Sequence, residues 1–305
     1  NNHANWPTPG TSAAGAVQRP WEAGGVALVF RGPKGTGKGT LARAFCGLFG
    51  QHGLHITSQT LLVGRFNAHL RDVCALFADE AFWAGDKAGE SVLKGLITEP
   101  TLAYEGKGEN VATGRNCIHL IMASNEDWVV PAGMDGERRF AVFNVADDRH
   151  DREYWDKLNA ETSPSGMLSE LLARDVSAFD PFAVPANRAL AEQKLRSMGD
   201  VATWLYEMAL DNWEDFGPAV DGAYPTGEVQ SSYVRHCDRR NVRGRRASAV
   251  VLGMALRKLL PTVCKRRVLL HGSATQKMFY VLPPPEEAAR RIEELVGGMQ
   301  DVQDP

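Results

Sequence analysis

The feature that most constrains the fold of this chain is an apolar run that leads directly into a glycine-rich segment. Residues 26–31 read VALVFR, residues 32–40 read GPKGTGKGT, and apolar residues then recur at helical spacing. A strand, a glycine-rich turn and a helix start form the context that a phosphate-binding loop (P-loop) requires. The glycines let backbone N–H groups close around a phosphate, and the helix N-terminus adds a favourable dipole. The sequence therefore predicts a nucleotide phosphate site on an α/β fold, with a chance glycine-rich loop as the alternative.

Lys38 is the residue of this loop that we expect to reach the β- and γ-phosphates. The residues expected to surround the nucleotide are Gly32, Pro33, Lys34, Gly35, Thr36, Gly37, Lys38, Gly39, Thr40 and Leu41. A Ser or Thr usually follows the lysine and ligates Mg²⁺, whereas Gly39 stands there in this chain. The metal contact is therefore expected to move to Thr40 or to pass through a water molecule.

Two further apolar runs end in polar residues of the kind that phosphoryl transfer needs. Residues 74–78 lead into Asp79 and Glu80, and residues 118–124 lead into Asn125. One carboxylate must bind the hard cation and another must orient the attacking water, so we expect Asp79 at the metal and Glu80 at the water. Asn125 would place a neutral polar group beside the γ-phosphate. An ordinary loop after a strand is the alternative for each.

Two arginines, Arg138 and Arg139, stand immediately before the apolar run of residues 140–143. Taken alone, they would be an ordinary charged strand edge. Beside the elements above they become candidates for arginine fingers, which supply positive charge to a transferring phosphoryl group. Pairing of Arg139 with a local carboxylate, Glu137 or Asp135, is the alternative.

The alternation of short apolar runs with helical patterns predicts an α/β domain with a largely parallel sheet over residues 21–150. Residues 1–20 are interpreted as a linker or leader because they are rich in Asn, Gly, Ala, Ser and Pro. Residues 151–185 are predicted to form a helical connector. Strands are expected near residues 26–30, 74–78, 118–123 and 140–145, and helices near 38–49, 88–97, 154–158 and 167–172.

Residues 186–305 are predicted to form a basic, helical domain whose element order is typical of a winged helix. Helices are expected near residues 188–198, 201–210, 228–239 and 247–259, followed by strands near 267–270 and 277–282. The net charge of the chain is −3, but Asp238 is the one acid between Val229 and His271. Such a basic block is the usual footprint of a nucleic-acid partner, with a solvated helix face as the alternative. The DNA-contact candidates are Arg239, Arg240, Arg243, Arg245 and Arg246.

The composition excludes several other classes of protein. Hydrophobic residues make up 44% and charged residues 23% of the 305 residues, which argues against disordered, fibrous and membrane proteins. The apolar runs are far shorter than the roughly 20 residues of a membrane helix, and the first twenty residues lack the pattern of a signal peptide. The five cysteines form no CxxC pair, which argues against disulfides and zinc. We therefore expect the protein to be located in a reducing compartment. Since the initiator Met is missing, we also expect the chain to be a piece of a longer product.

In chain order, the P-loop, Asp79 with Glu80, Asn125 and Arg138 with Arg139 resemble the motifs of superfamily 3 helicases, a viral and phage branch of the AAA+ ATPases. More closely, the chain is similar to the helicase module of phage and prophage primase-helicase proteins. The segments that carry this similarity are residues 18–20, 64–67, 79–87, 124–131 and 138–140.

The resemblance implies a P-loop AAA+ core followed by a helical and winged-helix-like C-terminal domain. It also implies ATP and Mg²⁺ as cofactors, hydrolysis between the subunits of a homo-hexamer, and movement along single-stranded or forked DNA in phage or prophage replication. Arg139 would be the finger donated to the neighbouring subunit, with Arg138 the second choice. A primase-polymerase domain would lie upstream in the same chain or in an associated chain. The protein would be located in the cytoplasm of a bacterial host cell.

In the helicases that this chain resembles, a hairpin between the acidic pair and the asparagine projects a basic residue into the pore of the ring. The corresponding segments here are residues 93–99 and 104–110. Gly106 and Gly108 flank Lys107, as a tight turn with a projecting side chain would need. We therefore expect Lys107 to grip the DNA backbone, with a lysine in a flexible surface loop as the alternative.

Two other functions compete with a helicase. The order of Lys38, Gly39 and Thr40 also occurs in some nucleotide kinases. A kinase, however, leaves four residues unexplained: Asp79, Glu80, Asn125 and Arg139. An initiator that assembles on DNA with ATP and does not unwind processively remains open, although Glu80 and Arg139 favour hydrolysis.

Overall fold

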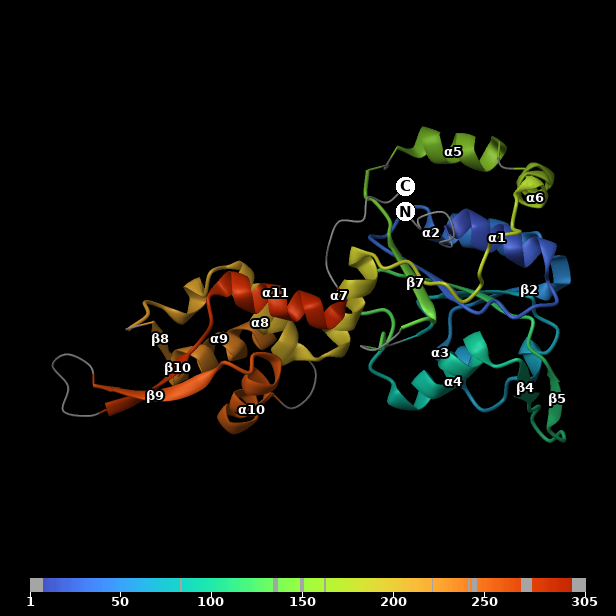
Figure 1. Cartoon of the computed structure of the whole chain (residues 1–305). Coiled ribbons are helices and arrows are strands. Elements are labelled where there is room, and N and C mark those ends of the chain that lie inside the picture. Colours follow the sequence, from blue (N-terminus) through green and yellow to red (C-terminus); the bar gives the residue numbers. More distant parts are fainter. Residues whose placement is uncertain are drawn as a thin grey trace. The chain divides into compact units, whose positions relative to one another are not determined.

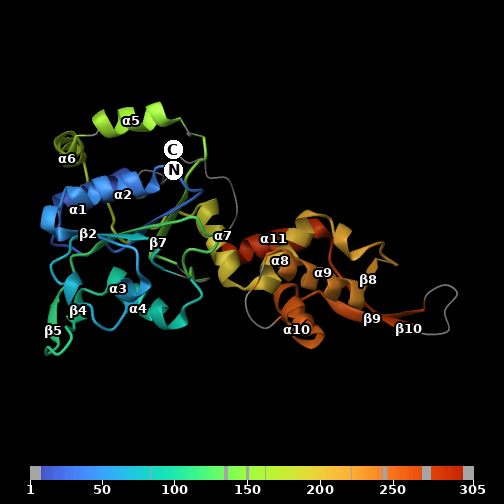
Figure 2. The same cartoon turned by 180° about the vertical axis from the view of Figure 1, so that it is seen from behind.

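A computed structural model describes residues 8–82, 84–133, 137–148, 151–161, 163–220, 222–240, 242, 246–269 and 276–297. The chain divides into two compact units, residues 1–193 (unit 1) and residues 194–305 (unit 2). Figures 1 and 2 show them from opposite sides. The sequence pattern favours boundaries near residues 150 and 185, whereas the helices between these positions belong to unit 1.

Unit 1 is built on a five-stranded sheet whose strands all run parallel. The strands lie in the order β2 (Gly53–Ile56), β3 (Ala75–Asp79), β6 (His119–Ser124), β1 (Ala27–Arg31) and β7 (Phe140–Asn144). The apolar runs predict four of these strands, and the expected α/β fold with a parallel sheet is confirmed. They do not predict β2, because its sequence GLHI is short and only half apolar.

Helices cover both faces of this sheet (Figure 1). They are α1 (Pro9–Gln18), α2 (Lys38–Gly47), α3 (Gln59–Val63) and α4 (Lys87–Thr98). Leu76 and Leu120 pack into the core on the side of α3 and α4, whereas their neighbours Phe77 and Ile121 pack on the side of α1 and α2. A parallel strand that is buried on both faces needs apolar residues at every position, which explains the continuous apolar runs.

The segment interpreted as a linker or leader contains helix α1. The Thr8 side chain caps its first turn by accepting a hydrogen bond from the Thr11 N–H at 3.2 Å, and Pro9 stands where a helix tolerates proline. Three small residues of α1 are buried: Ala14 packs with Leu171 of α6, Ala16 packs against the sheet, and the Phe179 ring lies where a Cβ on Gly15 would stand. Composition is misleading here, because small residues suit a closely packed helix as well as a linker.

Helices α5 (Arg152–Glu161) and α6 (Pro164–Ala173) form the expected helical connector. In Figure 1, α5 runs above α2 on the same side of the sheet. The amide of Gln18, at the end of α1, donates to the carbonyls of Leu171 and Arg174 at 2.8 Å each. These bonds satisfy carbonyls at the end of α6 that have no partner within the helix. Gln18 thus ties the C-terminal end of α6 to α1.

An antiparallel hairpin of β4 (Thr101–Tyr104) and β5 (Ala112–Arg115) follows α4, as expected. Buried Asn116 fixes its base, because its amide donates to the carbonyls of Leu96 at 2.9 Å and Glu99 at 2.8 Å. Single 3-10 turns complete the two units: Gly50–His52, Ala68–Leu70 and Glu214–Phe216.

Unit 2 combines helices with a three-stranded antiparallel sheet of order β8-β10-β9. Its elements, with α7 beginning in unit 1, are α7 (Arg188–Ser197), α8 (Asp200–Leu210), β8 (Ala223–Pro225), α9 (Thr226–Arg239), α10 (Ala249–Leu259), β9 (Cys264–Leu269), β10 (Gln276–Val281) and α11 (Pro285–Val296). The ring centroids of Phe216 and Tyr233 lie 5.7 and 5.6 Å from that of buried Trp204.

The expected helices and strands of residues 186–305 agree with these elements to within a few residues, whereas β8 and α11 are additional. The expected turn at residues 272–273 lies outside the described residues. Within the described parts of the chain, no helix is both long enough and apolar enough to cross a membrane.

Candidate functional site

The structure brings the glycine-rich loop (residues 32–37), Asp79, Glu80 and Asn125 to one edge of the parallel sheet. This edge, which we call the carboxyl edge, is where β1, β3 and β6 end. The N–H of Gly32 donates to the carbonyl of Ser124 at 3.2 Å, and the N–H of Glu80 donates to the carbonyl of Ala123 at 2.9 Å. Two backbone hydrogen bonds therefore link the three strand ends that the sequence singles out.

The glycine-rich loop adopts backbone angles that require glycine. Gly35 and Gly37 have φ angles of 84° and 87°, in the left-handed region that other residues avoid. Helix α2 begins directly afterwards at Lys38, with no side chain capping its N-terminus. The first N–H groups of α2 are thus available to an anion. Pro33, Lys34 and Gly35 are exposed.

The Lys38 ammonium group is bonded to its own loop. Its Nζ donates to the carbonyls of Gly32 at 2.7 Å and Pro33 at 2.6 Å, and lies 3.3 Å from the Thr36 hydroxyl oxygen. Burial lowers the pKa of Lys38, while the charges of Glu80 and Asp79 oppose that change. The acidic pair is therefore close enough to act on the ammonium charge electrostatically.

Asp79 pairs with a histidine that the sequence does not single out. Its Oδ2 lies 3.3 Å from Nε2 of His55 on β2, and the His55 ring stacks on Phe77 with centroids 4.6 Å apart. Glu80 is exposed and has a φ of 52°, a backbone conformation that non-glycine residues adopt at a cost and that is common at functional sites.

The residues at the carboxyl edge fit a magnesium ion bound together with phosphate. Mg²⁺ is usually held by one or two carboxylates and by substrate phosphates, and Asp79, Glu80 and Thr40 supply two carboxylates and a hydroxyl near the loop. The described residues contain no group of three or more His, Cys, Asp or Glu that would hold a metal ion by itself.

Gly39 stands where the usual loop sequence has Ser or Thr, and the side chain of Arg43 packs next to it. A Cβ at Gly39 would stand 2.9 Å from Nη1 of Arg43, so the guanidinium group takes up space beside the position where Ser or Thr is usual. Thr40 and Arg43 line the pocket around the loop. Arg43 thus adds a second positive side chain that the motif does not predict.

Arg138 and Arg139 lie at the opposite, amino edge of the sheet. The carbonyl of Arg139 accepts the N–H of Ala27, the first residue of β1, at 2.7 Å. The five residues of β1 separate that position from the glycine-rich loop by about 16 Å, at 3.3 Å per residue. The structure therefore does not bring these arginines to the loop of the same chain.

Arg139 is not paired with Glu137 through its side chain in the described structure. The Glu137 carboxylate accepts the backbone N–H groups of Gly133 at 2.7 Å, Arg138 at 3.0 Å and Arg139 at 2.8 Å. The Nε of Arg139 is buried and has no hydrogen-bond partner among the described residues. Asp135, the other suggested partner, lies outside those residues.

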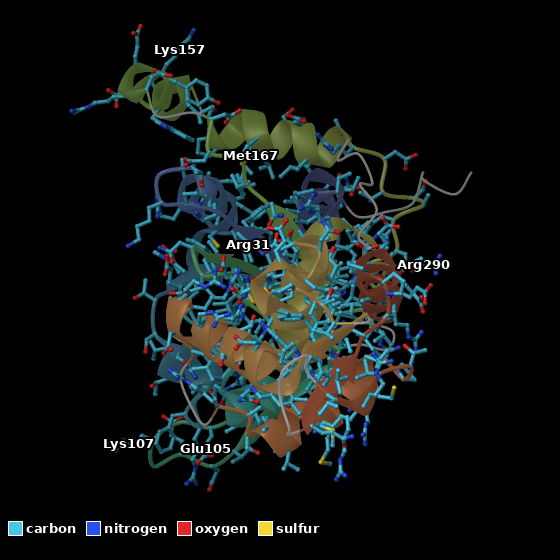
Figure 3. The ribbon with its side chains drawn as sticks, turned by 90° about the vertical axis from the view of Figure 1, so that its left-hand side faces the viewer. Arg31, Glu105, Lys107, Lys157, Met167 and Arg290 are labelled. Carbon is cyan, nitrogen blue, oxygen red and sulfur yellow. The ribbon has the colours of Figure 1, made fainter. Side chains whose placement is uncertain are left out.

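Lys107 is exposed in the connection between β4 and β5 (Figure 3). Residues 64–67 hold this connection in place. The Asn67 side chain accepts the N–H of Glu105 at 2.8 Å and donates to the carbonyl of Ala103 at 2.9 Å, and Arg65 pairs with the Glu105 carboxylate at 2.8 Å. Lys107 therefore lies on a hairpin whose position is fixed by the contacts of Arg65 and Asn67.

The C-terminal arginines are partly engaged within unit 2. Arg240 pairs with Glu207, and Arg246 pairs with Asp238. Arg239 is exposed, whereas Arg243 and Arg245 lie outside the described residues.

The nucleotide candidate is also bordered by a cavity that the sequence gives no sign of. It measures about 300 Å³ and lies between α2 and α5, next to the glycine-rich loop. Trp155 and Tyr154 of α5 line it. The sequence around the glycine-rich loop could not predict this cavity, because its other wall, α5, lies more than a hundred residues further along the chain.

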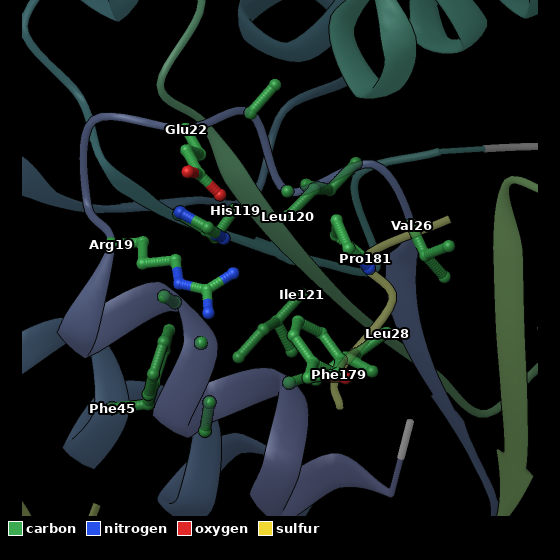
Figure 4. A pocket seen from close by; sticks show the side chains of 16 residues that line it. Arg19, Glu22, Val26, Leu28, Phe45, His119, Leu120, Ile121, Phe179 and Pro181 are labelled. Carbon is green, nitrogen blue, oxygen red and sulfur yellow. The ribbon is translucent and has the colours of Figure 1, made fainter. Parts of the chain in front are cut away.

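A second cavity, shown in Figure 4, lies between α1 and the sheet and is not suited to a nucleotide. Its volume of about 30 Å³ is roughly that of one water molecule in the liquid. His119 lines it with a buried Nε2 that has no hydrogen-bond partner among the described residues. Burial lowers the pKa of His119 to about 4.

The chain is similar to proteins of phage replication. Residues 30–139 match a family described as "Family of unknown function (DUF5906)". The DNA primase-polymerase of Nitratiruptor phage NrS-1 is 30% identical over 135 residues, which cover 43% of this chain and 18% of that protein. The chain thus corresponds to a small part of the length of this relative.

Solved structures extend the similarity over most of the chain. An apo structure of the NrS-1 C-terminal region aligns with a TM-score of 0.54 and 20% identity, covering 90% of this chain and 70% of that one. A second apo structure of the same region, the A form, gives 0.54 and 19%, with coverage of 89% and 70%. This chain is therefore similar in sequence to a phage primase-polymerase and shares its fold with the C-terminal region of that protein.

Proposed function

We propose that unit 1 is a P-loop ATPase core of the AAA+ type and that the chain is an ATP-dependent DNA helicase or translocase of phage or prophage replication. The observation that carries this proposal is the meeting of the glycine-rich loop, Asp79, Glu80 and Asn125 at the carboxyl edge of the sheet. The similarity to the NrS-1 primase-polymerase supports a role in DNA replication.

In the proposed reaction, the loop N–H groups and Lys38 hold the phosphates of ATP. Lys38 would exchange its bonds with the Gly32 and Pro33 carbonyls for bonds with phosphate oxygens. Glu80 orients a water molecule whose oxygen attacks the γ-phosphorus as the bond to the ADP oxygen breaks. Asn125 contributes a neutral polar group beside this water. Mg²⁺, held by Asp79 and Thr40, would neutralise charge on the phosphates.

The position of Arg139 favours a ring in which each pocket is completed by a neighbour. Arg139 lies at the amino edge of the sheet, too far from the loop of its own chain, and its Nε is buried with no described partner. An arginine supplied from another subunit stabilises transition-state charge and is worth roughly 10³ to 10⁵ in rate in well-studied systems. We therefore propose a homo-hexamer with Arg139 as the finger in trans and Arg138 as the second candidate.

The hairpin and unit 2 supply the proposed contacts with DNA. Lys107 is exposed on a hairpin fixed by Arg65 and Asn67, as a residue that grips a phosphate backbone would need to be. In unit 2, a helix, a strand, two helices and two antiparallel strands follow one another from α8 to β10, which is the order of a winged helix. The DNA-contact candidates named above, of which Arg239 at the end of α9 is exposed, would lie near the DNA.

Strand displacement on a forked DNA duplex tests this proposal. The wild-type chain, joined to any upstream domain that it needs, should unwind the fork with ATP and should stop with a nonhydrolysable analogue. Glu80→Gln should bind ATP and fail to hydrolyse it, because Glu80 orients water and contributes little to nucleotide binding. Glu170→Gln is the matched control, since Glu170 of α6 forms an ion pair with Arg174 at the surface, and a surface pair contributes little to stability. ATPase activity of Glu80→Gln within a few-fold of the wild type would contradict these roles.

A further inference from the structure

The cavity of about 300 Å³ beside the glycine-rich loop has two chemically different sides. Residues of the loop and the start of α2, namely Thr36, Gly37, Lys38 and Thr40, form the polar side. All other lining side chains are apolar or aromatic: Phe30, Leu41, Ala44, Val145, Tyr154, Trp155, Leu158 and Met167. Its size is at the lower end of the range typical of small-molecule sites. A ligand that fills it would carry a charged end and a flat or apolar end.

Trp155 stands at the junction of these two sides. It lines the apolar cavity and also the smaller pocket formed by residues 35–40 and Arg43. A Cβ built on Gly37 would lie 2.4 Å from the tip of the indole ring, so the ring lies directly against the loop backbone. Trp155 is the one side chain outside α2 and the loop that lines both described pockets.

The neighbouring side chains extend this aromatic surface. The ring centroids of Tyr154 and Trp155 lie 5.1 Å apart at an interplanar angle of 79°. Leu41, on the facing side of the cavity in α2, has 47% of its surface exposed. A cavity lined by an exposed leucine and a tryptophan, beside a polar pocket of about 280 Å³, is the arrangement expected around a heterocyclic base.

We propose that this cavity binds the base of the nucleotide whose phosphates occupy the glycine-rich loop, with Trp155 stacking on the base or ribose end. The proposal rests on the proposed nucleotide function of the loop and adds its base-binding half. Because the lining outside residues 36–40 carries few polar side-chain groups, affinity comes from stacking and burial. Stacking discriminates little between bases, since every base has a π-face. The ligand class is therefore a nucleoside triphosphate with weak base selection.

Calorimetric binding of two probes to the full chain separates the two halves of the site. ATP carries a base and a triphosphate, whereas inorganic tripolyphosphate carries only the charge. Trp155→Ala should weaken ATP binding by about five- to a hundredfold, the range of one aromatic stacking contact, and should leave tripolyphosphate binding within twofold. Trp155→Phe should restore ATP affinity to within a few-fold because it keeps an aromatic ring.

Two further variants serve as references. Lys38→Ala should weaken the binding of both probes, since it removes charge from the phosphate side. Trp21→Ala removes an exposed tryptophan of the same unit, one with 53% exposure, and should change neither.

The possible outcomes test the base site separately from the phosphate-binding loop on which it depends. An equal loss of both probes in Trp155→Ala, unchanged ATP binding in that variant, or no rescue by Trp155→Phe would overturn the base site while leaving the phosphate loop in place. Failure of the wild-type chain to bind either probe would overturn both. A preference of GTP, CTP or UTP over ATP, or the reverse, by more than a hundredfold would overturn the claim of weak base selection.

Discussion

Substitution of Gly37 by alanine should destabilise the folded chain in two separable ways. Gly37 has a φ of 87° and a ψ of −3°, and an L-residue in the left-handed region costs about 1–2 kcal/mol. In addition, the new methyl group would stand 2.4 Å from the Trp155 ring. Overpacking of this kind typically costs about 1–3 kcal/mol. The expected total for Gly37→Ala is therefore about 2–5 kcal/mol.

Gly35 provides the matched control for the backbone contribution. Its φ is 84°, and no atom lies within 4 Å of a Cβ built on it. Gly35→Ala should therefore cost only about 1–2 kcal/mol. The difference between the two variants isolates the contact with Trp155.

The assay is equilibrium unfolding in urea without nucleotide, with each variant compared on the same transition because a chain of two units can unfold in two steps. A double-mutant cycle with Trp155→Ala supplies the coupling energy. In the Trp155→Ala background, Gly37→Ala should cost no more than Gly35→Ala. Equal costs for the two glycine variants in the wild-type background, or a penalty for Gly37→Ala that persists without Trp155, would refute the reasoning.

Three further predictions concern stability, the hairpin and the finger. Burial lowers the pKa of His119 to about 4 against about 6.5 in the unfolded chain, so below pH 6.5 the unfolded chain takes up a proton that the folded chain does not. The free energy of unfolding should fall by at most about 3 kcal/mol between pH 6.5 and pH 4, and a pH series that is as steep in His119→Gln as in the wild type would contradict this origin. Lys107→Ala should keep basal ATPase activity and lose DNA stimulation and unwinding, and normal unwinding by this variant at moderate salt would argue against a hairpin contact with DNA. Mixing Lys38→Ala with Arg139→Ala chains should restore part of the ATPase activity, because some interfaces then pair an intact pocket with an intact finger; no recovery in confirmed mixed rings would count against a finger in trans.

The sequence predicts most of the sheet because β1, β3, β6 and β7 are apolar along most of their length, as their buried residues require. It also predicts the residues of the carboxyl edge, since each directly follows such a strand. The location of Arg139 at the opposite edge follows from the same rule, because a residue that precedes a parallel strand must lie at its amino end.

The sequence does not predict features that arise from contacts between distant segments. His55 lies on a short edge strand, and only the alignment of β2 with β3 brings it to Asp79. The residues that flank Trp155 in the sequence form no recognisable motif. Its ring reaches Gly37 only because α5 runs over α2. The small residues of α1 are typical of both a linker and a packed helix, and its contact with α6 decides between them.

The strand order has a consequence for synthesis of the chain on the ribosome. Of the five strands of this sheet, β1 is made before the others, but its two neighbours in the sheet are β6 and β7, which end at Ser124 and Asn144. At about 5–20 residues per second, the apolar segment ALVFR waits several seconds for its first hydrogen-bonded partner. Until then it is an unpaired strand of the kind that aggregates or recruits chaperones. A nascent chain that stalls between Arg31 and His119 should therefore be recognised by chaperones, and one that stalls well past Asn144, with β7 clear of the ribosome, should not.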